Sequence, residues 1–339
     1  MLTKAVIVLL FSLVVWAYQT IKPPPPKICG LPNGPPVTSP RIKLGDGRYL
    51  AYQERGVVKE NAKYKIIVVH GFDNSKDMNL AASQELIDEL GIYFLLFDRA
   101  GYGESDPNPN RSVKSEAFDI QELADQLELG SKFYVLGVSM GSYPTWGCLK
   151  YIPDRLAGAA LIVPVVNYWW PSFPSNLSRE GYGKLPLPDQ WSIRVAHYAP
   201  WLLYWWMTQN WFSSSSIVKS HPEIFSTRDK DILKKMAANL NRNQTKVRQQ
   251  GIFESLHHDY MVGFGNWEFD PMNLSNPFPQ ESKIVHIWQG YEDRLVPFQL
   301  QRFVAEKLPW IWYHEVDNGG HLIHHDSDLF ETMLRKLLL

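Results

Sequence analysis

The chain has little cysteine and no excess of charge of either sign. Cys29 and Cys148 are the only two cysteines among 339 residues, so no disulfide framework and no cysteine-based zinc site is expected. The 34 basic residues are balanced by 35 acidic residues, and this balance argues against a surface that binds nucleic acid. We therefore expect no nucleic-acid partner.

Patterns that would hold a metal or a dinucleotide cofactor are also missing. The adjacent pairs His257-His258 and His324-His325 diverge on a helix and cannot chelate one ion together, as i, i+4 histidines can. Gly101 and Gly103 imitate a dinucleotide-binding loop, but the third glycine and an immediate helix are absent. The sequence predicts neither a metal nor a cofactor.

One long apolar run is present, at the N-terminus. Residues 5–21 are apolar except for Ser12, Gln19 and Thr20, and as a helix they would span roughly 26 Å, slightly less than a hydrocarbon core. Pro23–Pro26 follow and predict a stiff, extended stem over residues 22–40.

Two interpretations of residues 1–21 remain open. We favour an uncleaved signal anchor, which would attach the protein to a membrane of the endoplasmic reticulum or secretory pathway. The alternative is a cleaved signal peptide and a secreted protein. Four Asn-x-Ser/Thr sequons are compatible with a lumenal domain in either case.

From residue 41 the sequence alternates between short apolar strands and helical segments. Strands that are apolar throughout and alternate with helices are typical of a parallel sheet covered on both faces. A hairpin around Asp46-Gly47 opens the pattern. The predicted strands are Arg41–Leu44, Tyr49–Arg55, Lys65–Val69, Tyr93–Phe97, Phe133–Val138 and Ala159–Val163, with helices over Leu80–Leu90 and Ser115–Leu129.

The alternation stops between residues 164 and 282. This segment has no comparable strand and contains eight tryptophans, which predicts a helical cap inserted between a first core part, 41–163, and a second, 283–339. Helices are expected over Gln190–Asn210, Arg228–Asn241 and Lys246–Val262. The second core part should contain the strands Ile284–Trp288 and Ile311–Val316 and the helices Phe298–Leu308 and Leu329–Leu338.

The strongest indication of a catalytic site is the motif Gly137-Val138-Ser139-Met140-Gly141. They lie between an apolar strand and a helical segment, where a sharp turn would lift the Ser139 hydroxyl clear of its own backbone. Glycines on both sides allow backbone and helix to approach closely. The weaker alternative for Ser139 is a helix-capping residue.

Three further motifs follow predicted strands: His70-Gly71-Phe72, Glu292-Asp293 and Gly319-Gly320-His321. In parallel α/β sheets, sites form at the carboxyl ends of strands. The chain resembles the α/β-hydrolase fold superfamily, in the branch related to epoxide hydrolases and monoacylglycerol lipases. The resemblance rests on these motifs, on Asp98-Arg99 through Ser105, and on Gly290 to Asp293 before Val296-Pro297. The stem and residues 35–41 are similar to plant hydrolases of unassigned substrate.

The resemblance implies an α/β fold with an eight-stranded, mostly parallel sheet and a helical cap after the sixth strand. It also implies a catalytic triad in the chain order serine, acid, histidine. Ser139 would be the nucleophile, His321 the general base, and Asp293 the residue that orients the imidazole. Backbone N–H groups of Phe72 and Met140 would form the oxyanion hole.

Each of these assignments has a competitor. His70 and Gly71 are expected to support the oxyanion loop and take no part in proton transfer. Glu292 competes with Asp293 but is expected to be a solvated loop residue. The competitors of His321 are His314, expected to be packed in a strand, and His324 and His325, expected at the surface.

The predicted activity is hydrolysis of a carboxylic ester or thioester of an apolar substrate by a serine nucleophile. Epoxide hydrolysis or dehalogenation would need a carboxylate at position 139. A lyase of the hydroxynitrile type, a ligand-binding receptor and a degenerate non-enzyme remain as alternatives, because a fold does not determine a function. Cap tryptophans could wall the acyl pocket or touch a membrane; the candidates are Trp169, Trp170, Trp201, Trp205 and Trp206.

Overall fold

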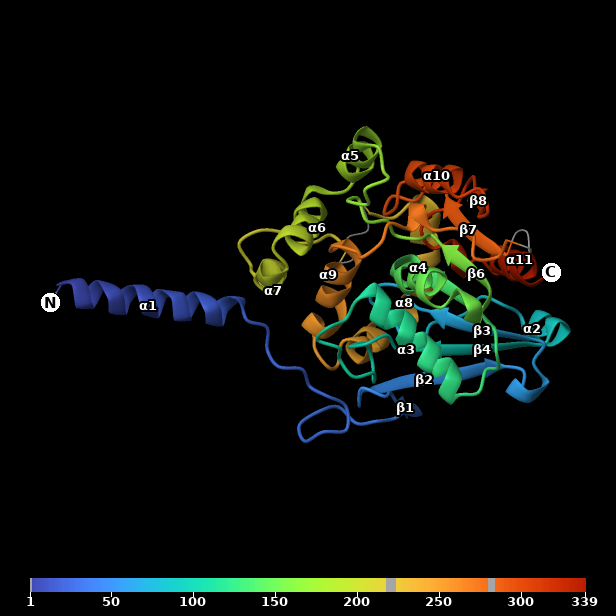
Figure 1. Cartoon of the computed structure of the whole chain (residues 1–339), viewed down its shortest axis with the longest axis horizontal. Coiled ribbons are helices and arrows are strands. Elements are labelled where there is room, and N and C mark those ends of the chain that lie inside the picture. Colours follow the sequence, from blue (N-terminus) through green and yellow to red (C-terminus); the bar gives the residue numbers. More distant parts are fainter. Residues whose placement is uncertain (1, 218–223, 280–283) are drawn as a thin grey trace.

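The computed structural model describes residues 2–217, 224–279 and 284–339. An eight-stranded sheet runs through it in the order β1-β2-β4-β3-β5-β6-β7-β8, with helices on both faces (Figure 1). β2 pairs antiparallel with β1 and with β4, and the other pairings are parallel, so the predicted sheet is confirmed. The strands are β1 (Arg41–Lys43), β2 (Tyr49–Gly56), β3 (Tyr64–Val69), β4 (Ile92–Phe97), β5 (Phe133–Val138), β6 (Leu156–Ile162), β7 (Val285–Gly290) and β8 (Trp312–Val316).

Five helices of the described chain lie between β6 and β7, which confirms a helical cap after the sixth strand. They are α5 (Ser175–Gly183), α6 (Leu187–Tyr198), α7 (Leu203–Thr208), α8 (Thr227–Val247) and α9 (His258–Phe264). The other helices are α1 (Leu2–Ile21), α2 (Gln84–Leu90), α3 (Val113–Gln126), α4 (Ser142–Tyr151), α10 (Phe298–Lys307) and α11 (Ser327–Leu338). The expected boundary at residues 282/283 lies outside the described residues.

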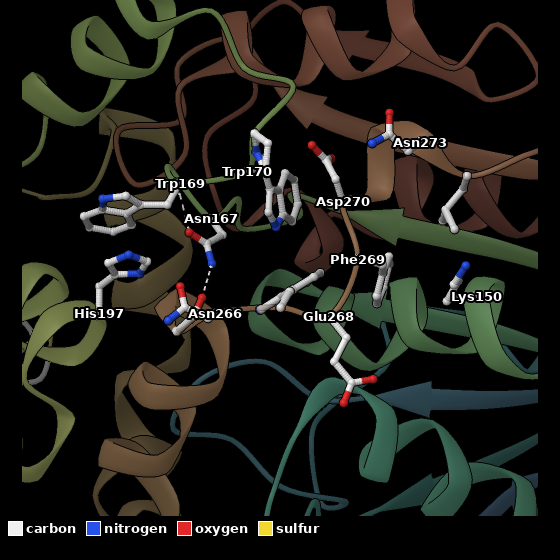
Figure 2. A pocket seen from close by; sticks show the side chains of 14 residues that line it. Lys150, Asn167, Trp169, Trp170, His197, Asn266, Glu268, Phe269, Asp270 and Asn273 are labelled. Carbon is white, nitrogen blue, oxygen red and sulfur yellow. Dashed lines mark hydrogen bonds between the residues drawn. The ribbon is translucent and has the colours of Figure 1, made fainter.

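Aromatic side chains hold part of the cap against the core. Within the cap, Trp169 stacks on His197 with ring centroids 4.1 Å apart (Figure 2). Trp170 packs edge-on against Trp146 of core helix α4, with ring centroids 6.5 Å apart. The Asn167 side chain accepts the N–H of Trp169 and donates to the carbonyl of Gly265, which satisfies the backbone beside these rings. These tryptophans therefore have a packing role.

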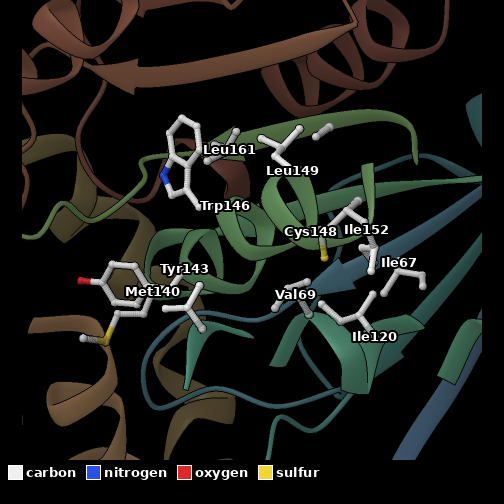
Figure 3. Close-up of a cluster of buried hydrophobic side chains, with 14 of the residues drawn as sticks. Ile67, Val69, Ile120, Met140, Tyr143, Trp146, Cys148, Leu149, Ile152 and Leu161 are labelled. Atoms are coloured by element: carbon white, nitrogen blue, oxygen red, sulfur yellow. The ribbon is translucent and has the colours of Figure 1, made fainter. Parts of the chain in front are cut away.

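The central strands divide their side chains between two apolar cores. In β3, Ile67 and Val69 face one core with helices α3, α4 and α10, whereas Ile66 and Val68 face the other with α2 and α11. Figure 3 shows the first core, where Ile67 and Val69 lie beside Ile120 of α3. This two-residue alternation, apolar on both faces, is the reason the strand reads as continuously hydrophobic in sequence.

Two predicted cap helices are interrupted in the structure. The segment expected to be one helix over 190–210 breaks between α6 and α7, because Pro200 lacks an N–H and disfavours a helical conformation at Ala199. The segment expected over 246–262 breaks at Gly251, whose φ is +137°, before a π-helical turn leads into α9. α2 begins at Gln84, later than predicted, because Ser83 caps it by accepting the N–H of Leu86.

At the N-terminus, α1 extends away from the rest of the chain (Figure 1). In the part of the chain that the structure describes, no helix is both long and apolar enough to cross a membrane. The signal anchor over residues 1–21 stays a prediction.

The segment expected to be a stem contacts both the cap and the core. The Lys27 N–H donates to the carbonyl of Gln250 at 2.8 Å, and the Thr38 hydroxyl donates to the Glu104 carboxylate at 2.5 Å. Burial opposes ionisation of Glu104, but this bond and the N–H groups of Thr38 and Ser39 outweigh it and lower its pKa to about 2. From Lys27 onward this segment is thus bonded to the domain.

Candidate active site

Ser139 lies at the sharp turn between β5 and α4. Its φ of +52° is left-handed, which is unusual for a residue with a side chain. A Cβ at Gly137 would lie 2.2 Å from Thr145 Oγ1, and one at Gly141 would lie 2.1 Å from the carbonyl oxygen of Val69. Both glycines are therefore required by close contacts, and the turn they permit lifts the Ser139 hydroxyl off the sheet.

The structure brings Ser139, His321 and Asp293 together, although 182 residues separate the serine from the histidine. His321 Nε2 lies 2.8 Å from Ser139 Oγ, and His321 Nδ1 lies 2.8 Å from Asp293 Oδ2. A carboxylate only accepts hydrogen bonds, so Nδ1 carries the proton and Nε2 is free to accept the serine proton. Burial lowers the pKa of His321, but the Asp293 carboxylate outweighs burial, and the pKa is raised above its ordinary value.

Asp293 is held by three further donors. The N–H groups of Leu295 and Val296 donate to Oδ1 at 2.8 and 3.0 Å, and Gln289 Nε2 donates to Oδ2 at 3.0 Å. These bonds fix the carboxylate toward His321. Glu292, its competitor in the sequence, is exposed.

The loop after β3 lies directly against the serine turn. A Cβ at Gly71 would be 3.2 Å from Ser139 Cβ, and both Phe72 and Met140 line the cavity beside the hydroxyl. His70 donates from Nδ1 to the carbonyl of Gly71 at 2.8 Å and accepts the Arg99 N–H at Nε2. Burial and the Arg99 charge lower the pKa of His70 well below its usual value, so it is neutral and shapes the loop.

The cavity beside Ser139 has a volume of about 230 Å³ and a largely apolar lining. Its described lining includes no tryptophan, so the prediction that cap tryptophans wall the substrate pocket is wrong. Trp169 and Trp170 instead border a separate cavity of about 430 Å³ (Figure 2), and Trp201 is exposed. Smaller apolar residues do the lining: Val165, Leu185, Ile193, Phe264, Leu295 and Leu322.

Two histidines expected at the surface also line this cavity. His324 is only 6% exposed and His325 is half-buried, and they share the cavity lining with the cap residues Ile193 and Phe264. Burial lowers the pKa of His325 to about 4 and that of His324 well below its ordinary value, so both are neutral at pH 7. His314 is packed as predicted, stacked on Trp288 with ring centroids 4.0 Å apart. Among the described residues, no three His, Cys, Asp or Glu side chains are grouped to hold a metal ion.

Sequence reasoning missed a buried ionic cluster that joins the core to the cap. Asp259 of α9 accepts two bonds of 2.6 Å from Arg99 and one of 2.5 Å from Arg111, and Tyr102 donates its hydroxyl to the same carboxylate. Arg99 also donates to the carbonyl of Gly71 at 3.2 Å, so the cluster reaches the loop beside Ser139. Nothing in the sequence pairs the run from Asp98 to Ser105 with Asp259.

A strained serine at the carboxyl edge of a mainly parallel sheet, bonded to a histidine and then to a carboxylate, is the arrangement found in α/β hydrolases. The chain belongs to the alpha/beta hydrolase family, whose model matches residues 66–332. The resemblance to the branch of epoxide hydrolases and monoacylglycerol lipases stays a prediction. No curated protein matches the sequence.

Solved structures with the same fold include enzymes of different specificity. An esterase from Thermogutta terrifontis is 21% identical, with a TM-score of 0.56 over 89% of this chain and 98% of its own. An esterase from Exiguobacterium antarcticum is 17% identical, with a TM-score of 0.57 over 89% and 99%. An enol-lactonase from Burkholderia xenovorans is 15% identical, with a TM-score of 0.61 over 88% and 99%. At these identities the likeness shows the fold alone.

Proposed function

We propose that this protein is a serine hydrolase that cleaves a carboxylic ester, or thioester, of an apolar substrate through an acyl-enzyme. The observation that carries the proposal is the continuous chain of two 2.8 Å hydrogen bonds from Ser139 through His321 to Asp293. The esterase activities of the two similar structures agree with it.

The chemistry follows from the geometry. Ser139 Oγ attacks the carbonyl carbon as His321 Nε2 takes its proton, and the negative charge develops on the carbonyl oxygen. The N–H groups of Phe72 and Met140 are the proposed donors to that oxygen; losing one such donor typically costs about 100- to 1,000-fold in turnover. The tetrahedral intermediate then expels the alcohol or thiol, which takes the proton from His321. Water repeats these steps on the acyl-enzyme and releases the acid.

The cavity suggests the substrate class. Its lining is mostly aliphatic and aromatic, and about 230 Å³ is below the roughly 300–1,000 Å³ of sites for drug-sized ligands. We therefore expect short to medium acyl chains to be accepted, with propionyl to hexanoyl esters preferred over acetyl.

A fluorophosphonate probe tests the proposal. Wild type should be labelled rapidly, the Ser139→Ala variant should not be labelled, and turnover of p-nitrophenyl butyrate should fall by at least about 1,000-fold in this variant. Ser142→Ala, at a buried serine in the first turn of α4, is the matched control and should keep labelling. An unlabelled, inactive wild type would favour a binding protein or a degenerate enzyme. Turnover of cyanohydrins without esters would favour the lyase.

We also propose that the protein works at a lipid surface. Trp201 is 66% exposed and Trp211 is 79% exposed, which is unusual for tryptophan, and aromatic side chains of this kind favour membrane interfaces. The C-terminal end of α1, whose apolar side chains are also exposed, contacts α7 beside them (Figure 1). Residence in the secretory pathway, or secretion after cleavage, stays a prediction from the N-terminal sequence.

A further inference from the structure

The first turn of cap helix α8 is closed by a reciprocal pair of bonds. The Asp229 N–H donates to Ser226 Oγ at 3.1 Å, and the Ser226 N–H donates to Asp229 Oδ2 at 3.2 Å. This capping box satisfies two backbone donors at the start of the helix. It accounts for an acidic residue at this position but uses only one of the two carboxylate oxygens.

The same carboxylate also holds the loop that carries His321. Asp229 Oδ2 accepts the N–H of His321 at 2.9 Å, and Oδ1 accepts the N–H of Leu322 at 2.8 Å. A Cβ at Gly320 would lie 2.1 Å from Asp229 Oδ2, so this approach requires a glycine before the histidine. Asp229 is 1% exposed, and hydrogen bonds from N–H groups to a buried carboxylate are strong and directional.

We propose that Asp229 is a positioning residue for His321: its carboxylate fixes the backbone of the histidine loop and couples cap helix α8 to the general base. The proposal rests on the proposed function. Asp229 is absent from the described residues that line the cavity, so it acts through His321 and not on the substrate. Sequence reasoning could not find it, because it lies 92 residues before His321 in the segment expected to form only a cap.

The charges around His321 indicate that Asp229 also affects the pKa of this histidine. Asp293, from the loop after β7, and Asp229, from α8, both favour the protonated imidazole and together outweigh burial. His324 and His325 of the following 3-10 turn are neutral near pH 7, because burial lowers their pKa values. Replacing Asp229 by a neutral isostere should therefore lower the pKa of His321 while Asp293 stays in place.

The test is Asp229→Asn in the full chain. An amide offers one acceptor oxygen, so its NH2 group would face either the His321 or the Leu322 N–H, donor against donor. We expect kcat for p-nitrophenyl butyrate to fall by about 10- to 100-fold, because small displacements of a catalytic group are costly. KM should be nearly unchanged, and the acid limb of kcat/KM should move to lower pH.

Two control variants separate positioning from helix capping. Asp231→Asn removes an exposed carboxylate of the same helix that pairs with Lys234, and it should keep the wild-type profile. Ser226→Ala removes the capping hydroxyl but leaves both bonds to the histidine loop, so it should lower stability without moving the pH profile. Asp229→Glu keeps the charge, so its pH profile should lie nearer to wild type than that of Asp229→Asn, and this comparison still holds if Asp229→Asn is less stable.

The result that would overturn the proposal is a pH profile and kcat of Asp229→Asn equal to those of wild type. An equal loss of kcat in Ser226→Ala would also overturn it, because helix capping would then explain the effect. NMR titration of the His321 imidazole reads its pKa without any turnover, and an unchanged value in Asp229→Asn would equally refute the coupling. Failure of the proposed function would appear differently, as a wild type that neither reacts with fluorophosphonate nor cleaves esters.

Discussion

At the scale of single residues, Ser139 and His321 are held in different ways, the serine by its neighbours in sequence and the histidine by residues distant in sequence. The serine is fixed by its own turn, where two glycines permit a left-handed backbone. The histidine is fixed from outside, through Asp293 and Asp229. The serine turn can therefore be recognised in a short motif, whereas the tertiary contacts that hold the histidine cannot.

The Asp293 carboxylate leads to a prediction about how kcat/KM depends on pH. Since His321 must be neutral to accept the serine proton, and its pKa is raised, kcat/KM should rise with pH through an apparent pKa above the ordinary value of about 6.5. Asp293→Asn removes the main charge that raises it, so the acid limb should move to lower pH. Turnover should fall by about 10,000-fold, the order found when the aspartate of a serine-protease triad becomes asparagine. Initial rates between pH 5 and 9 would measure both effects.

Glu292→Gln is the control for this prediction. Glu292 is adjacent in sequence, carries the same charge and is exposed, so its loss should leave rate and profile nearly unchanged. Near wild-type turnover in Asp293→Asn, or a large loss in Glu292→Gln, would contradict the assignment of the acid.

The sequence motifs predicted the three residues that the structure brings together, because each follows a strand that ends at the same edge of the sheet. They could not predict Gln289 and Asp229, whose side chains act only once distant segments are in contact. His324 and His325 were placed wrongly at the surface for the same reason, because the cavity that they line is formed with segments distant in sequence.

At the scale of elements, the ionic cluster around Asp259 connects helix α9 of the cap to the turn after β4. Arg99, Arg111, Asp259 and Glu116 are all buried, and the bonds from the two arginines to the two carboxylates offset the cost of desolvating them. Burial opposes ionisation of Asp259, but the two arginines outweigh it and lower its pKa to about 2. The attachment of this part of the cap should therefore depend on the Asp259 charge.

Asp259→Asn should destabilise the protein by about 3–5 kcal/mol at pH 7, because the two buried arginines are left with Glu116 as their single carboxylate partner in the cluster. The folded pKa is below the ordinary value of 3.8, so the contribution is complete above about pH 5 and is lost as the pH falls towards 2. The gap in unfolding free energy between wild type and variant should shrink across this window, by an amount on the order of 2 kcal/mol. Urea unfolding at pH 7, 5, 4 and 3 would measure it.

Glu268→Gln serves as the comparison for Asp259→Asn. Glu268 is exposed and lies 3.9 Å from the exposed Lys114, and such surface pairs contribute little. Its replacement should change the unfolding free energy little at every pH. A gap for Asp259→Asn that stays constant from pH 7 to pH 3 would show that its ionisation does not support the cluster.

Predicted and observed elements agree where a short run of apolar residues or a single glycine determines the local structure. The strands follow from apolar runs that are buried on both faces, and α2 ends at Gly91, as predicted from the glycine, whose φ is +66°. The cap helices were predicted less well, because apolar periodicity continues across Pro200 and Gly251 while the backbone does not. Periodicity reports which face is buried, and it does not locate the break.

At the scale of the whole molecule, exposed aromatic side chains gather in one part of the cap. Trp191 and Phe212 both contact Trp206, and Trp211 contacts Trp205, which is next to Trp206 on α7. Together with the exposed Trp201, which lies just before α7, we call these residues the aromatic surface. It adjoins α7, where the C-terminal end of α1 makes contact. Large exposed apolar surfaces commonly mark sites of contact with proteins or membranes.

We predict that this surface binds lipid and that binding survives loss of α1. A chain starting at residue 22 should co-sediment with vesicles of phosphatidylcholine and phosphatidylserine, and Trp201→Ser with Trp211→Ser should reduce the bound fraction several-fold. Phe118→Ser is the matched control, because Phe118 is 44% exposed but lies on α3, outside the cap. Burial of each exposed tryptophan in the interface contributes about 25 cal/mol of binding free energy per Å² of apolar area, so two together should change the affinity measurably.

Equal sedimentation of the double variant and the Phe118 control would show that the aromatic surface does not contact lipid. Turnover of a soluble ester should be the same in all three chains, since Trp201 and Trp211 do not line the cavity beside Ser139 among the residues that the structure describes.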